Sequence, residues 1–576
     1  MMFSVWAPTA KSMDLLWSEQ RIAMRQSKEG SWETEVEGAR TGDRYQYSVD
    51  GGRPLPDPRS RWQPDGVHGS SAVVDIAELR KIHSSGFRAR PLREAVIYEM
   101  HVGTFTPEGT YQAAQHKLAH LAGLGVTHVE LLPVATFPGR YGWGYDGVDL
   151  YAPLPAYGTP QDLARFVAAC HEQGLAVLLD VVYNHVGPDG DYLAAFGPYF
   201  SDRVKTPWGD AINFDGRYSD GVRSFVTDNA LMWLQDYGFD GLRLDAVHAI
   251  FSFEAVHLLE DFVTAVRVLA VKLNKDCALI AESDLNNPRL VQAPARGGYG
   301  LSAHWADDFH HAIHRFFTGE AGGYYADFNG LGDIAAALRS GYVYQGQYSD
   351  YRRRRHGRVP KGVTSDQLVV FSQNHDQIGN RVQGERLSML LQPAQLKAVA
   401  ALILLSPFVP MLFQGEEWGA MTPFIYFTDH ENQELARLVT EGRTREFQAF
   451  GWKGEVPDPQ DPQSFLRSKL DWSELDQPQH AELLQWYCRM IELRHAMLDH
   501  LSKRRARVAF NEESRWLRFG VGDLLVLLNG AEEPRRVPMP TGSWELTASS
   551  SAGDVEVSKE MPGWGVRVFR RGSSAV

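Results

Sequence analysis

The sequence predicts a multidomain α/β protein, in which a central (β/α)8 TIM barrel lies between an N-terminal β-sandwich and a C-terminal antiparallel β domain. Two observations carry this prediction. Between residues 94 and 505, short apolar runs alternate with helical patterns, as parallel strands buried on both faces and their crossover helices do. On either side of that region, polar and apolar residues alternate in short runs, as they do in half-buried strands.

Length and composition set the outer limits of the interpretation. A chain of 576 residues is too long for one ordinary hydrophobic core, so we expect several domains. The formal net charge of −13 argues against a nucleic acid partner and against an anionic membrane surface. No secretory signal or membrane-spanning run is visible, which favours a cytoplasmic protein. The cysteines are expected to be reduced core thiols; they are Cys170, Cys277 and Cys488.

Residues 1–75 are expected to form the N-terminal β-sandwich, of immunoglobulin-like type. Alternating runs follow one another at the spacing of a small sandwich and are separated by glycine, proline and lysine-containing turns. Residues 76–93 are charged and at first helical in pattern, so we expect a linker there. The alternating runs are Phe3–Trp6, Met13–Trp17, Trp32–Val36 and Arg44–Val49.

Residues 94–505 are expected to form the barrel. The helical pattern of Pro160–Gln173 ends at Gly174, and glycine is the usual residue just beyond a helix C-terminus. A second helix is expected at Gln112–Leu124. Strands and helices of this number and length favour a closed barrel over an open sheet. The expected strands are Val96–Met100, Val126–Leu131, Leu175–Val181, Phe239–Leu244, Ala278–Ala281, Leu301–Trp305, Gln367–Ser372 and Val409–Phe413.

Long segments interrupt the barrel pattern at two places. Residues 186–222, after the third strand, are rich in Gly, Pro, Asp and aromatic residues, and are too long for an ordinary βα loop, which indicates a small subdomain or a lid. Residues 318–365 form a second, tyrosine-rich insertion. We interpret its basic run Arg352–Arg355 as a solvated charged turn, with contacts to sugar hydroxyls or closure over the substrate as the alternative. After Arg505 the β-type alternation returns, so residues 506–576 are expected to form the C-terminal β-sheet domain.

Acidic and basic residues follow the apolar runs at four strand ends. A (β/α)8 barrel presents its catalytic groups at the C-terminal ends of its strands. The four stretches supply three carboxylates to one expected pocket, and cleavage of a glycosidic bond usually takes a pair. They are Asp180-Val-Val-Tyr-Asn-His185, Gly241-Leu-Arg-Leu-Asp-Ala-Val-His248, Ala281-Glu-Ser-Asp284 and Phe371-Ser-Gln-Asn-His-Asp376.

Two of the carboxylates have sequence neighbours that favour different protonation states. Asp245 lies two residues after Arg243, so both side chains project to the same side of a strand, where the guanidinium lowers the pKa of the carboxyl group. An ionised carboxylate is what a glycosidase nucleophile requires. Glu282 follows an apolar run, which favours a raised pKa and therefore a proton to donate.

The remaining polar residues of these stretches are expected to support the pair. Asp376, beside His375, is expected to bind sugar hydroxyls and to stabilise positive charge at the anomeric carbon. Asp180 is expected to orient the arginine, and His185 to bind a hydroxyl. A single acid at a strand end is usually a loop cap or a salt-bridge partner, but acids at four strand ends of one barrel favour a common site.

These stretches resemble the four signature regions of the α-amylase superfamily, glycoside hydrolase family 13, and the three-domain plan resembles that family as well. The resemblance implies that Asp245 is the nucleophile, Glu282 the general acid/base and Asp376 the transition-state stabiliser. It implies that Tyr145, in Trp143-Gly-Tyr-Asp-Gly147, stacks beneath the sugar at the cleavage point. It also implies a supporting set, which comprises Asp180, His185, Arg243 and His375.

Further stretches narrow the resemblance to the maltooligosyltrehalose trehalohydrolases. The most discriminating is Trp305-Ala-Asp-Asp-Phe-His-His-Ala-Ile-His314, and Gln373-Asn-His-Asp-Gln-Ile-Gly-Asn-Arg381 is another. The resemblance implies retaining hydrolysis of the α-1,4 bond next to a terminal trehalose in maltooligosyltrehalose, within trehalose biosynthesis, where a maltooligosyltrehalose synthase makes the substrate. A branching, debranching or maltogenic enzyme of the same superfamily, or a catalytically silent carbohydrate-binding barrel, remains as an alternative.

The implied chemistry needs no metal or organic cofactor, so we expect none. Asn184 occupies the position that holds calcium in many α-amylases, but the insertion that would complete the site is short, and we expect no structural calcium. The rings of Trp208, Tyr325 and Tyr351, in the two insertions, are expected either to bind glucose faces and close off the trehalose end or only to pack their own loops. The N-terminal domain resembles carbohydrate-binding modules; its residues Trp6, Trp17 and Trp32 are either core, which we favour, or a glycan surface.

Overall fold

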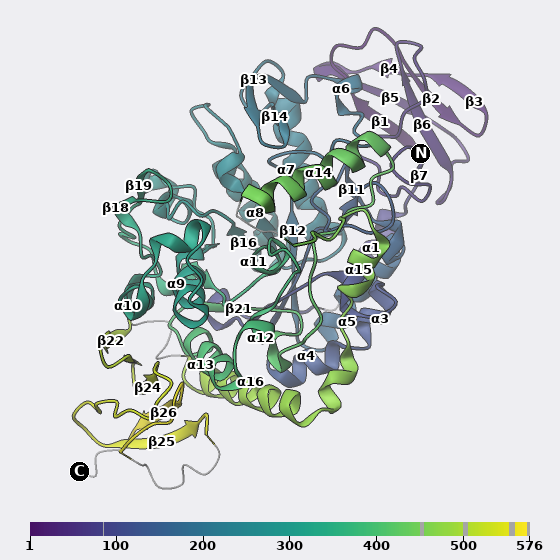
Figure 1. Ribbon diagram of the computed structural model, residues 1–576. Helices are drawn as coiled ribbons and strands as arrows, with labels where there is room; N and C mark the ends of the chain where they lie inside the picture. Colours follow the sequence, from purple (N-terminus) through teal and green to yellow (C-terminus); the bar gives the residue numbers. More distant parts are fainter. Residues whose placement is uncertain (84–85, 450–453, 499–504, 552–558, 573–576) are drawn as a thin grey trace.

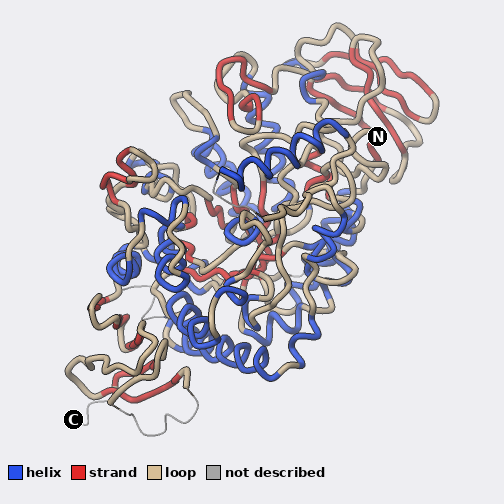
Figure 2. Tube along the Cα trace, viewed as in Figure 1, coloured by secondary structure: helices blue, strands red, loops and turns tan. Residues whose placement is uncertain are grey.

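The computed structural model describes residues 1–83, 86–449, 454–498, 505–551 and 559–572. Figure 1 shows the barrel in the middle, with the N-terminal β domain and the C-terminal β domain at opposite ends of the molecule. Figure 2 shows the helices arranged around the central strands. The predicted fold class is confirmed. The residue numbers at which the domains were divided stay a prediction.

The N-terminal domain consists of two sheets, as a sandwich requires. One has the strand order β1-β5-β4 and the other β3-β2-β6-β7. Trp32 is buried and its Nε1 donates a hydrogen bond to the carbonyl oxygen of Ala7 at 3.0 Å. Trp6 lies edge-on to Tyr199 of the first insertion, with ring centroids 5.2 Å apart. The strands are β1 (Met2–Trp6), β2 (Met13–Trp17), β3 (Gln20–Ala23), β4 (Arg25–Gln26), β5 (Ser31–Glu35), β6 (Arg44–Val49) and β7 (Ser71–Ala72).

The central strands form one closed barrel in the order β12-β15-β16-β17-β20-β21-β8-β9, and all the predicted strands are confirmed. Every pair in it is parallel. Apolar side chains such as Leu178, Ile280 and Met411 fill the barrel interior, as is usual for this fold. The strands are β8 (Ile97–Met100), β9 (His128–Leu131), β12 (Ala176–Val181), β15 (Gly241–Leu244), β16 (Ala278–Ala281), β17 (Ala303–Trp305), β20 (Leu368–Val370) and β21 (Val409–Phe413).

Helices pack around the barrel. The first predicted helix is divided into α3 (Tyr111–Gln115) and α4 (Leu118–Leu124), whereas the second is continuous as α5 (Pro160–Glu172) and has a capping box at Thr159. Arg494 of the last helix donates hydrogen bonds to the carbonyl oxygens of Leu404, Ser406 and Phe408, just before β21. The other long helices are α7 (Ser219–Asp236), α8 (Leu258–Leu273), α9 (Asp307–Thr318), α10 (Gly330–Ser340), α13 (Pro393–Leu404), α14 (Gln433–Ala449) and α16 (Pro478–Ala496).

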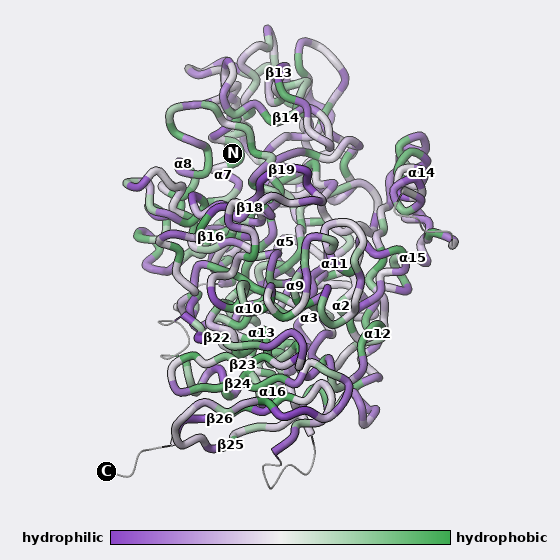
Figure 3. Tube along the Cα trace, turned by 60° about the vertical axis from the view of Figure 1, so that its left-hand side comes forward, coloured by the Kyte–Doolittle hydropathy of each residue, from purple (hydrophilic) through white to green (hydrophobic). Residues whose placement is uncertain are grey.

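Both predicted insertions carry hairpins. The first contains β13 (Phe200–Thr206) and β14 (Gly209–Ile212), and the second contains β18 (Gln345–Ser349) and β19 (Arg354–Gly357). Figure 3 shows the β18–β19 hairpin as a hydrophilic segment. The segment between β21 and α16 contains α14 (Gln433–Ala449) and α15 (Pro462–Arg467), two helices that we did not predict from the sequence.

The C-terminal domain is an antiparallel sheet with the strand order β22-β23-β24-β26-β25, as predicted. Trp564 of this domain packs edge-on against Phe316 of α9, with ring centroids 5.9 Å apart. Its strands are β22 (Arg507–Asn511), β23 (Trp516–Val521), β24 (Leu524–Asn529), β25 (Trp544–Ser549) and β26 (Val566–Arg571).

Within the residues that the structure describes, none of the helices is both long and apolar enough to cross a membrane.

Candidate active site

Neighbouring barrel strands bring the predicted carboxylates together. Asp180 lies in β12, Asp245 directly follows β15, and Glu282 directly follows β16. The strand register pairs Leu244 with Ala281, so the next residue of each strand, the Asp and the Glu, lies at the same level of the barrel mouth. Asp376 comes from the short helix α11 (His375–Gly379), which follows β20.

The guanidinium of Arg243 links these groups. Its Nη1 donates to both carboxylate oxygens of Asp180 at 2.8 Å and to Oδ1 of Asp245 at 2.7 Å. Its Nη2 lies 3.3 Å from Oε2 of Glu282. The side chain is fully buried, and its Cζ lies 4.2 Å from the centroid of the Trp305 ring. One fixed cation therefore contacts three acidic groups and holds the expected catalytic pair close together.

Asp245 is held in its ionised form. Asn184 Nδ2 donates to its Oδ2 at 2.9 Å, and the amide oxygen of the same asparagine accepts a hydrogen bond from His185 Nδ1. Burial opposes ionisation, but the charge of Arg243, the neighbouring histidine and these hydrogen bonds outweigh it and lower the pKa of Asp245. The side chain remains 12% exposed, so a substrate can reach it.

Glu282 is held in the opposite protonation state. Burial raises its pKa to about 8, which Arg243 only partly offsets and Asp245 reinforces. Its Oε2 accepts a hydrogen bond from the backbone N–H of Ala246 at 2.6 Å. Ala246 has a φ of 37°, in the left-handed region that strains an alanine, and this turn directs its N–H to the glutamate. Oε1 has no partner within the described residues, so it can carry the proton at neutral pH.

Tyr145 and His375 form the floor beside the carboxylates. The Tyr145 hydroxyl donates to Asp180 Oδ2 at 2.6 Å and lies 2.8 Å from His375 Nε2. His375 Nδ1 lies 2.6 Å from Oε1 of Glu99, and Oε2 of the same glutamate accepts the His375 backbone N–H at 3.0 Å. Burial opposes protonation of His375, but Asp376 and Glu99 raise its pKa to about 9. The imidazolium therefore donates from both nitrogens.

The first insertion adds an aromatic side chain to the site. The ring of Trp208, at the turn between β13 and β14, stacks on His185 with centroids 5.1 Å apart and an interplanar angle of 13°. His185 Nε2 lies 3.1 Å from the carbonyl oxygen of Tyr145. Trp208 is 47% exposed, so its other face is open to solvent or to a sugar. The structure therefore brings Trp208 to the side of the site where Asp245 lies.

Comparison with known proteins identifies the family to which this chain belongs. Residues 69–201 match the model of the α-amylase catalytic domain, and residues 1–63 match carbohydrate-binding module 48, the isoamylase N-terminal domain. A malto-oligosyltrehalose trehalohydrolase of Rhizobium sp. (strain M-11) is 46% identical over 99% of this chain and 97% of its own length. That of Arthrobacter ramosus is 49% identical over 86% of this chain and 87% of its own length. The chain belongs to the malto-oligosyltrehalose trehalohydrolase family.

A solved structure agrees with this assignment at the level of the whole fold. A crystal structure described as a putative alpha amylase from Salmonella typhimurium has a TM-score of 0.91 and 36% sequence identity, and the match covers 99% of this chain and 97% of that one. Because the trehalohydrolase relatives match nearly the whole chain, they favour this family over the branching, debranching or maltogenic alternatives.

In the second insertion of this trehalohydrolase family member, Tyr325 does not have the exposed ring that binding to a glucose face requires. Tyr325 is buried; its hydroxyl lies 2.8 Å from His310 Nε2, and its ring stacks on His314 at 4.2 Å. The structure therefore does not bring Tyr325 to an open surface, because its ring packs the insertion onto α9. Tyr324, which the sequence analysis did not select, is only partly buried and lies edge-on to Tyr351, with ring centroids 6.5 Å apart. Tyr351 is 46% exposed.

The prediction that Arg352–Arg355 forms a solvated charged turn is wrong for Arg352. The side chain of Arg352 is only 11% exposed; its Nη2 lies 3.2 Å from Asp284 Oδ2, and its Nη1 lies 3.6 Å from Asp327 Oδ2. A guanidinium between two carboxylates is a structural cross-link, whereas Arg354 and Arg355 are exposed, as a solvated turn predicts. Arg352 thus connects the β18–β19 hairpin to the loop that follows Glu282.

Two further anchors join the second insertion to the barrel. Oδ2 of Asp308 accepts hydrogen bonds from Asn286 Nδ2 at 2.7 Å and from the backbone N–H groups of Val343 and Tyr344 at 2.7 and 2.8 Å. Arg381, just beyond α11, donates to both oxygens of Glu320 at 2.7 and 2.9 Å. A bidentate arginine–carboxylate pair fixes orientation as well as distance.

Sequence reasoning missed several polar residues of the site. Glu99 lies in the buried strand β8, and a glutamate inside an apolar strand was the available signal for it. Asn184, which follows β12, was considered only as a calcium position, and its hydrogen bond to Asp245 was not expected. Arg443 of α14 donates to the Gly379 carbonyl at 3.0 Å and to Asn380 Oδ1 at 3.1 Å, so this segment also supports the helix of Asp376. No sequence motif marked α14.

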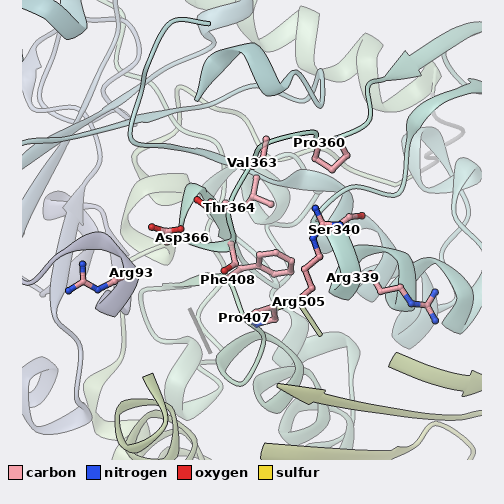
Figure 4. Close-up of a pocket in the computed structure, with 12 residues that line it drawn as sticks. Arg93, Arg339, Ser340, Pro360, Val363, Thr364, Asp366, Pro407, Phe408 and Arg505 are labelled. Atoms are coloured by element: carbon pink, nitrogen blue, oxygen red, sulfur yellow. The ribbon is translucent and has the colours of Figure 1, made fainter. Parts of the chain in front are cut away.

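A separate cavity of about 450 Å³ lies at the other end of the barrel (Figure 4). Its walls include Phe408, just before β21, and Asp366, just before β20, so it opens at the N-terminal ends of the strands. In Figure 4 the Arg339 side chain extends away from Phe408, and its guanidinium donates to the Val508 carbonyl at 2.9 Å.

Among the described residues, no group of three or more His, Cys, Asp or Glu side chains is arranged to hold a metal ion.

Proposed function

We propose that this chain hydrolyses the α-1,4-glucosidic bond next to the terminal trehalose of maltooligosyltrehalose, with retention of configuration, and releases trehalose and a maltooligosaccharide. The observation that carries the proposal is the shared contact of Arg243 with Asp245 and Glu282. A retaining mechanism needs two carboxyl groups about 5–5.5 Å apart, and a shared guanidinium keeps them near each other. The trehalohydrolase names of the relatives supply the choice of bond.

In the first step, Glu282 donates its proton to the glycosidic oxygen while Asp245 attacks the anomeric carbon. The C–O bond to the leaving trehalose breaks, and a bond from the aspartate oxygen to the sugar forms. The opposite pKa shifts of the two carboxyl groups support these roles, since one is ionised and the other protonated at neutral pH. Asp376, as the third carboxylate, stabilises the positive charge that develops at the anomeric carbon.

In the second step, the ionised Glu282 accepts a proton from water, and the water oxygen attacks the anomeric carbon of the glycosyl-enzyme. The bond to Asp245 breaks and the aspartate leaves as a carboxylate, stabilised by Arg243 and by Asn184 Nδ2 at 2.9 Å. Glu282 is then protonated again, and the cycle is complete.

The two insertions support a division of the site into two sides. Trp208 stacks on His185 beside Asp245, so we assign this side to the maltooligosaccharide part. Arg352 contacts Asp284, two residues after Glu282, so we assign the second insertion, with Tyr351, to the leaving trehalose. Tyr145 and His375 lie between the two sides, below the expected position of the reacting sugar.

We further propose that the chain acts in the cytoplasm after a maltooligosyltrehalose synthase. The first test is a product analysis in which the enzyme is incubated separately with maltotriosyl-trehalose and with maltopentaose, and the sugars are separated by anion-exchange chromatography. Rapid release of trehalose from the first, with slow cleavage of the second, is the expected result. Equal cleavage of both, or new α-1,6 linkages, contradicts the proposed choice of bond and indicates another activity of the α-amylase superfamily.

A further inference from the structure

We propose that Asp307 is a specificity-determining residue, which binds a hydroxyl group of the terminal glucose of the leaving trehalose, the unit at which a trehalose end differs from a maltose end. This inference rests on the proposed function and deepens it. Asp307 belongs to the discriminating stretch Trp305–His314. Its position, its neighbours and the lack of a partner among the described residues lead to the proposal.

The strand order places Asp307 between two of the expected catalytic carboxylates. It is the first residue of α9 and follows the end of β17, Trp305, by two residues. In the barrel β17 lies between β16, which Glu282 follows, and β20, which precedes α11 and Asp376. Four consecutive strands, from β15 to β20, are therefore each followed by an acidic residue at the mouth of the barrel.

The carboxylate of Asp307 has no hydrogen bond or ion pair within the described part of the chain, although the side chain is partly buried. Its sequence neighbour Asp308 makes three hydrogen bonds to the insertion and is thus structural. A carboxylate removed from water without a partner is unfavourable. This cost is balanced when a bound ligand supplies the missing donors.

A purely structural role for Asp307 is an acid in the first turn of a helix, where the helix dipole favours the ionised form. The surroundings oppose this role. Burial, and then the charges of Asp284, Asp308 and Asp376, raise the pKa of Asp307 to about 7. Burial and the neighbouring charges therefore disfavour the ionised form, so the position in the first helical turn does not by itself account for an acid here.

The neighbours of Asp307 indicate which sugar it contacts. Asp284, the first among the charges that act on it, holds Arg352 of the second insertion at 3.2 Å. Tyr324 of the same insertion is also affected by the charges of Asp307 and Asp376. His185, in the loop after β12, and Trp208, in the turn between β13 and β14, lie instead on the side of Asp245. Asp307 thus lies on the side of the general acid, where the leaving trehalose binds, and its oxygens suit the hydroxyls of the terminal glucose of that disaccharide.

Kinetics on two substrates of equal length give the first test. For Asp307→Ala we expect kcat/KM on maltotriosyl-trehalose to fall about 100-fold, because a site built around a hydroxyl contact loses it. On maltopentaose we expect a change below about 3-fold, and for Asp307→Asn, which keeps one acceptor, an intermediate loss. Asp220→Asn is the matched control: Asp220 is an exposed acid in the first turn of α7, and we expect no change on either substrate.

Equal losses on both substrates overturn the specificity role. If the unsubstituted enzyme releases no trehalose, the proposed function fails, and that outcome is separate because it is seen before any substitution. A binding experiment does not depend on turnover: trehalose and maltotriose are titrated calorimetrically into Asp245→Asn and into Asp245→Asn/Asp307→Ala. We expect the second substitution to weaken trehalose binding about 10-fold or more and to leave maltotriose binding unchanged; unchanged trehalose binding overturns the inference.

Discussion

The guanidinium of Arg243 lies over the indole ring of Trp305, with its Cζ 4.2 Å from the ring centroid. Both side chains are fully buried, so the stacking fixes the plane of the guanidinium in the barrel mouth. That plane determines which nitrogen points to Asp180 and Asp245 and which points to Glu282. The neutral residue Trp305 thus controls the charge arrangement of the expected catalytic groups.

Replacing Arg243 with lysine keeps the charge but removes the planar fork. A single ammonium cannot contact Asp180, Asp245 and Glu282 in the same geometry, so we expect kcat to fall by at least about 100-fold with a small change in KM. Steady-state kinetics on maltotriosyl-trehalose measure this, with circular dichroism as the control for folding. Near-normal kcat in Arg243→Lys would show that the charge alone suffices.

Asp245→Asn removes the expected nucleophile with almost no change in volume. We expect turnover to fall by about 10⁴-fold or more, while folding and oligosaccharide binding persist, because asparagine cannot form the glycosyl-enzyme. Activity assays and calorimetric binding of maltotriose check the two parts of the prediction. Substantial activity in this variant means that the nucleophile is assigned to the wrong residue.

Glu282 determines the alkaline limit of activity. With its pKa raised to about 8, the group is protonated below that pH and loses its proton above it, so kcat/KM is expected to decline as the pH rises through about 8. The pKa of the folded state lies above the ordinary value of 4.5, so the folded state also loses stability relative to the unfolded state as the pH rises between these values. A pH–rate profile and pH-dependent urea denaturation measure both effects. An alkaline limb that survives in the residual activity of Glu282→Gln contradicts the assignment.

Trp208→Ala tests the stacking on His185. The ring is half exposed, so its removal is expected to change the free energy of unfolding by less than about 1 kcal/mol. The histidine loses its orientation beside Asp245, and we expect kcat/KM to fall about 10-fold on maltotriosyl-trehalose and on maltopentaose alike. The sequence alone led us to expect an effect on trehalose-end selectivity; a loss confined to the trehalose-ended substrate would support that earlier expectation.

Arg494→Met tests the buried guanidinium of α16. The substitution leaves the carbonyl oxygens of Leu404, Ser406 and Phe408 without their donor, and we expect the free energy of unfolding to fall by about 2–4 kcal/mol. Urea denaturation measures the loss. Arg489 lies on the same helix but is 39% exposed, so Arg489→Met is the matched control, with an expected change below about 1 kcal/mol.

The sequence predicted the barrel strands because each is a short apolar run buried on both faces, such as Ala176–Val181. It also predicted the grouping of Asp245, Glu282 and Asp376, because parallel strands bring their C-terminal ends to one mouth. Contacts between distant segments could not be predicted in the same way. The burial of Tyr325 beneath Tyr324, and the pairing of Arg352 with Asp284, depend on how the insertion folds back. The support that α14 gives through Arg443 likewise has no local sequence pattern.

The β18–β19 hairpin of the second insertion is joined to the barrel by polar anchors, which are the hydrogen bonds of Asp308 to Val343 and Tyr344 and the Arg352–Asp284 pair. The rest of the insertion is fixed more extensively, because α10 packs on α9 and β22, and Tyr325 stacks on His314 of α9. The hairpin therefore constitutes a transplantable module. Exchanging this module together with its anchor residues between related barrels is a route to enzymes that attack different chain ends with unchanged chemistry, and a route by which such preferences can diverge in evolution.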